Sequence, residues 1–349
     1  MKKVSVVTNC YNVADVIHRC WASLRSQTIG LEHMECIFVD DASTDDGRTL
    51  AALQSIKEEA PDSVRIIRSE TNGGPGGAMN IGIAQASGEY LQLMNSDDEF
   101  VPDALERLYA IASEHRTDII QFFHILTLGD QQQINNQSAE NRLYEIRTPA
   151  DRRPFLNSTI VTYGCTNKFY RTKLVKDAGV RFAEHMVYEE PLFVYPLFLY
   201  ANRVYLYKEG LYIYHLHEGS VVTSRLGRQL MDHPRVQLML LYDCMKRTDL
   251  YAEYSDVIAC YFLWTYYCET ILFAGEQTDA VIPLDVLNEM QRVCLTLYPQ
   301  WRDNPQIRLV DRETRNLLAT MEHRFETQEE LNRFIHLSPW KNDRQDPAD

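Results

Sequence analysis

Hydrophobic and polar positions follow two alternating periods over residues 1–126. Short apolar runs such as VSVV (4–7) and ECIFVDD (35–41) are typical of buried strands. Between these two runs, apolar residues recur every three or four positions in 13–27, which predicts a helix with one face toward a core. We expect strands at 4–7, 35–41, 64–69, 90–94 and 118–126, and helices at 13–27, 45–59, 77–86 and after Pro102. This alternation predicts an α/β fold with a mostly parallel sheet flanked by helices.

The rest of the chain follows other patterns. Residues 127–160 are polar, and we expect them to form a mobile excursion. Mixed strand and helix patterns return up to residue 225, and the pattern is helical from Leu226 onward. We therefore expect a first domain over 1–225, divided into a part at 1–126 and a part at 127–225. A C-terminal helical region is expected over 226–349.

Charge and cysteine content narrow the class of protein. The formal net charge of −14 argues against nucleic acid or an anionic membrane surface as the main partner. The eight cysteines are scattered without a CxxC pair, which is typical of core thiols in a reducing cytoplasm. The start MKKVSVV lacks the apolar stretch of a signal peptide, and no uninterrupted apolar run approaches the ~20 residues of a membrane span. We expect a cytoplasmic protein without an integral membrane segment.

Three acids, Asp97, Asp98 and Glu99, directly follow the apolar run that ends at Met94. Carboxylates do not stay ionised in apolar surroundings unless something holds them. A divalent cation that bridges a diphosphate would do so, since Mg²⁺ and Mn²⁺ prefer oxygen ligands. The alternative is that Asp97 or Asp98 caps the helix that begins near Pro102.

Polar residues and glycines also follow the other predicted strands. In an open parallel sheet, ligands bind beyond the carboxyl ends of the strands. The adjacent acids Asp40 and Asp41 suit hydrogen bonds from a base N–H or ribose hydroxyls; alternatively, they lie in a turn before a helix capped by Ser43 or Thr44. The loop NGGPGG (72–77) permits close backbone approach but lacks the Lys-Ser/Thr of a P-loop.

Six motifs in this order carry a family resemblance: VSVVTNCYN, FVDDASTDDG, NGGPGGAMNIGI, YLQLMNSDD, NKFYRTKLV and YEEPLF. The first 225 residues resemble the family 2 glycosyltransferases, which have a Rossmann-like GT-A fold; the resemblance implies a nucleotide-binding half at 1–126 and an acceptor half at 127–225. The resemblance implies an inverting transfer of a sugar from a nucleoside diphosphate donor, usually a UDP-sugar, to an acceptor hydroxyl. By the same analogy, the acceptor is a cell-surface polysaccharide, a teichoic-acid-like polyol-phosphate polymer or a glycoconjugate precursor.

The resemblance also assigns roles to residues of this chain. Asp97 is expected to bind Mn²⁺ or Mg²⁺, while Asn95 replaces the usual first acid of the metal motif. His217 is expected near the metal and the leaving diphosphate, with His215 as another metal candidate; ordinary packing of this His-x-His pair is the alternative. The donor contacts implied by the resemblance are Thr8, Tyr11, Asn12, Asp40, Asp41, Asn80, Asn95, Ser96, His217, Ser220 and Arg225.

Glu190 falls where the family carries its catalytic base, with Glu in place of the usual Asp. Such a carboxylate removes the proton of the acceptor hydroxyl as the oxygen attacks the anomeric carbon. The alternative is that Glu189 and Glu190 simply begin a helix, which its dipole favours. Met79 stands where many relatives carry Arg. The departures at Asn95, Met79 and Glu190 also leave open a non-catalytic sugar-nucleotide or glycan-binding module. Peripheral placement at the inner face of the membrane and a homo-oligomer through the C-terminal region are further expectations.

Overall fold

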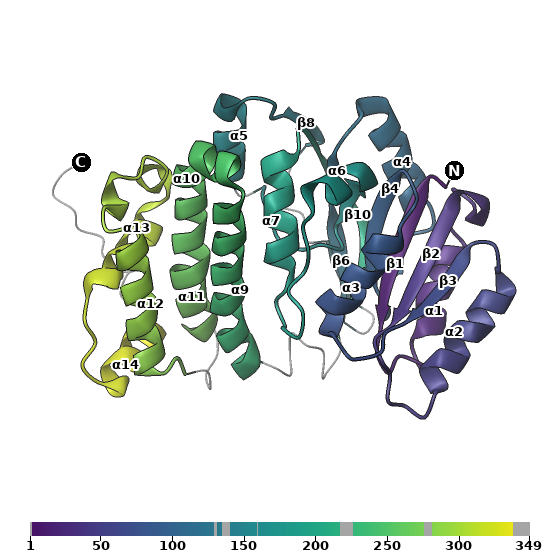
Figure 1. Cartoon of the computed structure of the whole chain (residues 1–349), viewed down its shortest axis with the longest axis horizontal. Helices are drawn as coiled ribbons and strands as arrows, with labels where there is room; N and C mark the ends of the chain where they lie inside the picture. Colours follow the sequence, from purple (N-terminus) through teal and green to yellow (C-terminus); the bar gives the residue numbers. More distant parts are fainter. Residues whose placement is uncertain are drawn as a thin grey trace. The chain divides into compact units, whose positions relative to one another are not determined.

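The structure is a computed structural model, and it describes residues 2–128, 131–134, 140–158, 160–216, 226–275 and 281–337. The chain forms two compact units, drawn in Figure 1. The first unit comprises residues 1–152 and 161–220, and the second comprises 153–160 and 221–349. The expected domain boundary at 225/226 adjoins residues 217–225, which lie outside the described ranges, so that boundary stays a prediction.

A single sheet forms the centre of the first unit. Its ten strands, counted over the described residues, follow the order β3-β2-β1-β4-β9-β6-β10-β5, with β7 beside β6 and β8 beside β10. The strands are β1 (Val4–Cys10), β2 (Met34–Asp40), β3 (Val64–Arg68), β4 (Tyr90–Asn95), β5 (Glu99–Phe100), β6 (Ile119–Leu128), β7 (Gln131–Ile134), β8 (Arg142–Glu145), β9 (Lys168–Arg171) and β10 (Arg203–His215).

The direction of the strands determines which loops meet. Strands β3, β2, β1 and β4 are parallel, and β6 is parallel to β10. Because β9 is antiparallel to both β4 and β6, the strands β4, β6 and β10 all point the same way. The predicted α/β fold with a mostly parallel sheet is confirmed. The carboxyl ends of β1, β2, β4, β6 and β10 therefore lie along the same edge as the beginning of β9.

Helices cover both faces of this sheet, as Figure 1 shows for α2 and α3. On one face, apolar side chains from α1, α2 and α4, including Trp21 and Leu105, pack on Val4 and Val6 of β1. The helices associated with this unit are α1 (Ile17–Arg25), η1 (Leu31–His33), α2 (Arg48–Glu59), α3 (Gly74–Gln85), α4 (Ala104–His115), α6 (Thr172–Ala178) and α7 (Glu190–Tyr200), with α5 (Pro149–Leu156) crossing the boundary between the units.

The opposite face of the sheet is covered by α3, α6 and α7. Gly82 allows α3 to approach β1 and β2, since a Cβ at this position would lie 2.2 Å from Val7 Cγ1. Phe193 of α7 stacks on Phe182 and meets the edge of Tyr170, with ring centroids 4.2 and 5.6 Å away. These contacts hold the first residues of α7 close to the edge of the sheet where the strand ends meet.

The expectation of a mobile excursion over 127–160 is wrong for the described part of that segment. Strand β6 continues to Leu128, β7 pairs with β6, and β8 pairs with β10, both antiparallel. Each of these added strands has one neighbour in the sheet. Peripheral strands bury few side chains, so their sequence can be polar. A polar strand lacks the apolar pattern from which strands are predicted.

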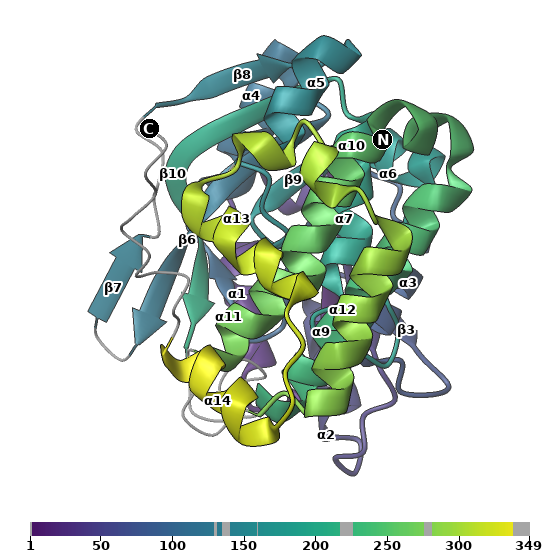
Figure 2. The ribbon, with the colours of Figure 1, turned by 90° about the vertical axis from the view of Figure 1, so that its left-hand side faces the viewer.

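The second unit is helical, as predicted for the C-terminal region, and Figure 2 looks onto it. Within it, α10 packs on α9, and α12 and α13 contact the π-helical turn η2. Its elements are α9 (Leu226–Lys246), α10 (Thr248–Leu263), η2 (Trp264–Glu269), α11 (Thr270–Gly275), α12 (Leu284–Leu297), η3 (Trp301–Asp303), η4 (Ile307–Leu309), α13 (Arg312–Ala319), η5 (Thr320–Glu322) and α14 (Gln328–Leu337).

One continuous helical stretch in this unit, Thr248–Gly275, is long and apolar enough to cross a membrane by length and composition alone. Of its most apolar window, 72% is buried inside the structure, and a core helix meets the same two criteria. Phe262, Tyr266 and Tyr267 within it are almost fully buried. These aromatic residues therefore form helix core, and the stretch is weak evidence for a membrane span.

Candidate active site

The predicted site residues that the structure describes gather at one edge of the sheet. Strand β1 lies between β2 and β4, with Cys10 opposite Asp40 and Asn9 opposite Asn95. The three strands thus end at the same level. Two strand spacings separate Asp40 from Asn95, which corresponds to about 10 Å. A single ligand the size of a nucleotide can reach both ends.

The loops after β1 and β2 are joined by hydrogen bonds. Asn12, with a φ of 55°, accepts at Oδ1 from the Thr44 backbone N–H at 2.8 Å and donates its own N–H to Ser43 Oγ at 3.0 Å. The Tyr11 hydroxyl lies 3.4 Å from Thr44 Oγ1, and Tyr11 is 45% exposed. The first loop is therefore fixed, while the Tyr11 ring is available at the surface.

The acids after β2 are both buried. Asp40 accepts at Oδ1 from the Ser43 N–H at 3.1 Å, and its Oδ2 lies 3.4 Å from Arg68 Nε. Asp41 accepts at Oδ1 from the Gly73 N–H at 2.9 Å. Burial raises the pKa of Asp41, and the backbone N–H groups of Gly73 and the next residue oppose this change. Asp41 thus joins the end of β2 to the glycine-rich loop.

Several polar atoms at these strand ends are buried without a hydrogen-bond partner. Within the described part of the chain, these atoms include Thr8 Oγ1 and Asn9 Oδ1, while Asp40 Oδ2 has the Arg68 ion pair but no hydrogen bond. Buried polar atoms are almost always satisfied in folded proteins, and exceptions require an explanation. A polar ligand at the ends of β1 and β2 would supply the missing partners.

Neither Ser43 nor Thr44 caps α2, and neither Asp97 nor Asp98 caps α4. Both capping predictions are therefore wrong, although the Asp40 side chain does close a turn with the Ser43 N–H. Helix α2 has Gly47 as its N-cap residue, and Asp45 rather than Ser43 or Thr44 accepts from the Thr49 N–H, at 2.9 Å. Helix α4 has Asp103 as its N-cap residue, well beyond the acids after β4. The acids at the strand ends therefore need another explanation.

Asn80 lies in α3 and binds a loop from elsewhere in the chain. Its Nδ2 donates to Phe182 O and Glu184 Oε1, both at 3.1 Å, and its Oδ1 accepts from the Phe182 N–H at 2.9 Å. This side chain fixes the segment that leads to α7. Its expected donor contact stays a prediction.

The turn after β4 is fastened to β10 by Asp98. This buried carboxylate accepts at Oδ2 from the Tyr212 hydroxyl at 2.6 Å and from Asn95 Nδ2 at 3.3 Å. Its Oδ1 accepts from the His215 N–H at 3.0 Å. Burial, followed by the neighbouring charge of Asp97, raises the pKa of Asp98 to about 7. Asp98 is thus a structural acid that faces inward.

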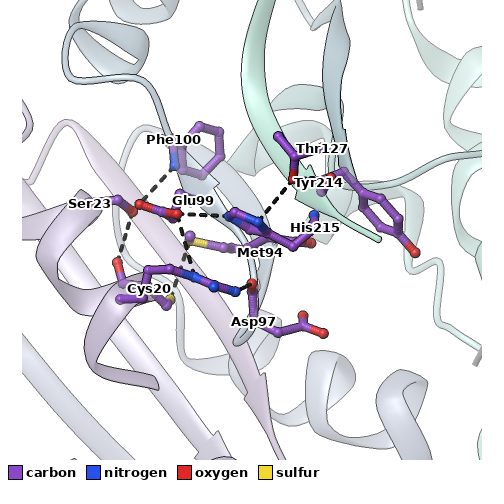
Figure 3. Close-up of polar contacts among 11 residues, drawn as sticks. Cys20, Ser23, Met94, Asp97, Glu99, Phe100, Thr127, Tyr214 and His215 are labelled. Atoms are coloured by element: carbon purple, nitrogen blue, oxygen red, sulfur yellow. Dashed lines mark hydrogen bonds and ion pairs between the residues drawn. The ribbon is translucent and has the colours of Figure 1, made fainter. Parts of the chain in front are cut away.

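Asp97 faces the other way. Figure 3 shows its side chain directed away from the pair formed by Glu99 and His215, while its carbonyl accepts from Arg19 Nη2 at 2.5 Å. The His215 Nε2 lies 2.8 Å from Glu99 Oε1, and Nδ1 lies 3.0 Å from Thr127 Oγ1. Since both ring nitrogens are occupied, this arrangement favours ordinary hydrogen bonding over metal ligation for His215.

Glu190 is the first residue of α7, and Glu189 is its N-cap residue, so these acids do begin a helix. Glu190 Oε1 accepts from the Cys165 backbone N–H at 2.7 Å. Burial, followed by the charge of Glu190, raises the pKa of Glu189 to about 8. A protonated Glu189 therefore lies beside Glu190, which is compatible with a base role as well as a helix start.

Tyr214 relates the base candidate to the acidic turn. Its pKa is raised to about 12 by burial, and the charges of Asp98, Asp97 and Glu190 contribute in that order. Strand β9 begins beside the end of β4, and Glu190 binds Cys165 just before β9. Asp97, just after β4, and Glu190 therefore lie at the same edge of the sheet.

A metal at this edge would rely on few protein ligands. Among the described residues, no group of three or more His, Cys, Asp or Glu side chains could hold a metal ion. Mg²⁺ and Mn²⁺ are commonly held by one or two carboxylates together with substrate phosphates. The Asp97 carboxylate fits that pattern. His217, Ser220 and Arg225 lie outside the described residues.

Several residues of the site were not predicted. Arg19, Thr127 and Tyr212 gave no signal, because they contact the acidic turn from distant helix and strand positions. Lys168 lies within the NKFYRTKLV motif, and its complete burial could have been suspected from its place in an apolar strand.

Comparison with known proteins agrees with this geometry. The family model "Glycosyl transferase family 2" matches residues 5–179. This chain belongs to that family. Its fold and the residues at the strand-end edge of the sheet agree with this class of protein.

Two relatives match this chain over part of their own length. A poly(ribitol-phosphate) beta-glucosyltransferase from Bacillus spizizenii is 32% identical over 61% of this chain and 32% of its own length. The poly(ribitol-phosphate) beta-N-acetylglucosaminyltransferase TarS from Staphylococcus aureus is 30% identical over 61% of this chain and 35% of its own length. The chain therefore matches about a third of each of these relatives.

Solved structures share the fold. The crystal structure of S. aureus TarS 1–349 in complex with UDP-GlcNAc matches with a TM-score of 0.74 and 24% identity, covering 97% of this chain and 92% of that one. A mannosyltransferase from Pyrobaculum calidifontis in complex with GDP-Man and Mn²⁺ matches with a TM-score of 0.51 and 14% identity, over 98% and 88% of the two chains. At these identities the likeness establishes the fold alone.

Proposed function

We propose that this protein is an inverting glycosyltransferase that moves a sugar from a UDP-sugar to a hydroxyl of a cell-surface polymer. The observation that carries the proposal is that Asp97, just after β4, and Glu190, bound to Cys165 just before the adjacent β9, lie at the strand-end edge of a family 2 fold. The buried acids Asp40 and Asp41 lie two strands away along the same edge.

The nucleotide is expected at the ends of β1 and β2. There, Thr8 Oγ1 and Asn9 Oδ1 are buried without hydrogen-bond partners among the described residues, as expected for groups that await a ligand. Asp41 and the fixed loop at Asn12 complete this part of the edge. The TarS complex with UDP-GlcNAc supports a uridine nucleotide as the donor class.

Asp97 would hold a divalent cation, with His217 as a second ligand. When bound, Mn²⁺ or Mg²⁺ supplies positive charge that stabilises the departing diphosphate. Asp98, Arg19 and Tyr212 hold the turn so that Asp97 alone points outward. Hydrogen bonds within this chain therefore determine that Asp97 points outward and Asp98 points inward.

Glu190 would accept the proton of the acceptor hydroxyl as its oxygen attacks the anomeric carbon. The Cys165 N–H orients the carboxylate through Oε1, and the Cys165 side chain also hydrogen-bonds to it. Glu189, with its pKa of about 8, is neutral at pH 7 and so adds no competing charge. Attack from this side, opposite the leaving group, gives inversion at the anomeric carbon.

The acceptor class follows from the relatives. Two of them are named poly(ribitol-phosphate) glycosyltransferases, so we propose a polyol-phosphate polymer as the acceptor. A protein with such substrates would act in the cytoplasm or at the inner face of the membrane. A homo-oligomer through the helical unit remains part of the proposal.

The direct test is UDP release from UDP-GlcNAc, UDP-glucose and UDP-galactose, with poly(ribitol phosphate) as acceptor and Mn²⁺ or Mg²⁺ present. Glu190→Gln should lower transfer at least ~100-fold, because a general base contributes that much, and should leave UDP affinity within about threefold. The matched control is Glu189→Gln, which imitates the protonated state of Glu189 and should retain most activity.

A non-catalytic binding module of the same fold is the rival. It would bind a UDP-sugar without releasing UDP in the presence of any acceptor. Transfer that persists in Glu190→Gln would instead refute the base assignment while keeping the enzyme class.

A further inference from the structure

Lys168, the first residue of β9, is a fully buried lysine beside the candidate base. Its ammonium donates to Thr162 Oγ1 at 3.0 Å, to the Gly164 carbonyl at 2.5 Å and to Asn167 Oδ1 at 3.1 Å. All three acceptors belong to the loop 162–167 that precedes β9. The lysine therefore organises this loop from within.

The same loop holds Glu190. The Cys165 N–H, between the Gly164 carbonyl and the Asn167 side chain that bind the lysine, donates to Glu190 Oε1 at 2.7 Å. The Tyr170 hydroxyl donates to the Cys165 carbonyl at 3.2 Å, which fixes the peptide on its other side. A continuous path of hydrogen bonds thus runs from the ammonium through the loop to the carboxylate.

The burial of this lysine is unfavourable by itself. Complete burial lowers the pKa of Lys168 to about 7, and the charges of Glu190 and Cys165 oppose that decrease. Its three hydrogen-bond partners are neutral. A buried charge that binds neutral groups costs stability, so its presence calls for a reason beyond folding.

We propose that Lys168 is a positioning residue for Glu190, holding the loop that orients the base and, when protonated, placing a positive charge behind it. This inference rests on the proposed transferase function. The other titratable groups near the pair are Glu189 at the start of α7, Cys165 and Tyr170 around β9, His124 on β6 and Tyr214 on β10.

The test compares Lys168→Met and Lys168→Gln with the wild-type chain, and uses Lys173→Met as control. Lys173 is an exposed lysine of α6 that pairs with Asp177. Lys168→Met should lower kcat at least tenfold and leave UDP affinity within twofold. The acidic limb of the pH profile of kcat/KM should move to higher pH, because a carboxylate without a nearby cation keeps its proton to higher pH. Lys173→Met should change none of these quantities.

The glutamine variant separates charge from hydrogen bonding. Lys168→Gln can still donate to the loop, so it should lose less kcat than Lys168→Met but show the same shift of the acidic limb. In a Glu190→Gln background, Lys168→Met should add no further loss. An unmoved acidic limb, or a loss of UDP affinity equal to the loss of kcat, would overturn the proposal.

Two further measurements keep the test decisive. If thermal unfolding shows that neither lysine variant folds, Thr162→Val removes one partner of the ammonium at an exposed position. It should lower kcat a few-fold at constant UDP affinity, and unchanged kcat would overturn the proposal. Absence of transfer by the wild-type chain would instead refute the proposed function itself.

Discussion

Asp97 and Asp98 are adjacent acids with different tasks, and only the structure distinguishes them. The sequence predicts that acids after β4 must be held by a ligand or a cap, which follows from the cost of burying charge. It does not predict that Asp98 accepts from Tyr212 and His215, because these partners are more than a hundred residues away. The candidate metal ligand is therefore the acid that this network leaves facing outward.

His124 shows how a residue near the site should affect stability. It lies on β6 with Nε2 at 3.0 Å from Thr166 Oγ1 and its ring against Tyr212 and Tyr214. Burial, followed by the positive charge of Lys168, lowers the pKa of His124 from 6.5 to about 4. Between these pH values the unfolded chain binds more protons than the folded one, so stability falls as the pH falls.

We therefore predict that His124→Gln reduces the acid sensitivity of folding. Urea unfolding at pH 7.5 and pH 5 should show a smaller loss of unfolding free energy in the variant than in the wild-type chain, because glutamine carries no proton-linked cost. Equal losses in the two proteins would show that His124 is not held neutral in the folded state.

Helix α3 illustrates what an element contributes to the site. Its glycine-rich start was predicted to allow close backbone approach to a ligand. The structure shows that Gly76 instead allows the start of α3 to lie against residues 182–189. A Cβ on Gly76 would lie 2.2 Å from the Ala183 carbonyl oxygen and 3.0 Å from Glu189 Cγ. The reason could not be seen in the sequence, since residues 182–189 are distant along the chain.

Gly76→Ala should therefore disturb the segment that leads to Glu190. We expect a destabilisation of about 1–3 kcal/mol, the usual cost of overpacking, together with a loss of transfer activity. The neighbouring Gly77→Ala is the matched control, because its Cβ would meet only Glu184 Cγ at 3.9 Å. Thermal unfolding and UDP release check both variants, and similar behaviour of the two would contradict this role for Gly76.

At the scale of the whole molecule, the alternation of strands and helices was predicted well, and so was the shared edge of the strand ends. The order of the strands was not, because β9 inserts antiparallel between β4 and β6 and brings the loop of Lys168 to that edge. The second unit also includes residues 153–160, far from its other residues in sequence. Long-range pairing of this kind leaves no local pattern.

Ligand binding should stabilise the whole chain. UDP at a hundred times its Kd should raise the free energy of unfolding by about 2.7 kcal/mol and so raise the melting temperature. Addition of Mn²⁺ together with UDP should raise the melting temperature further. Asp97→Asn should abolish the part that depends on Mn²⁺ but not the part due to UDP alone. The control is Asp62→Asn, which alters an exposed acid just before β3, at the opposite edge of the sheet. A normal Mn²⁺ response in Asp97→Asn would exclude Asp97 as the metal ligand.

The central claim is a single displacement at the anomeric carbon, with Glu190 as the base. Proton NMR of the product formed from a UDP-sugar with α configuration measures this most directly, since the anomeric coupling constant reports the configuration of the new bond. The account predicts a β-linked product. An α-linked product would contradict it.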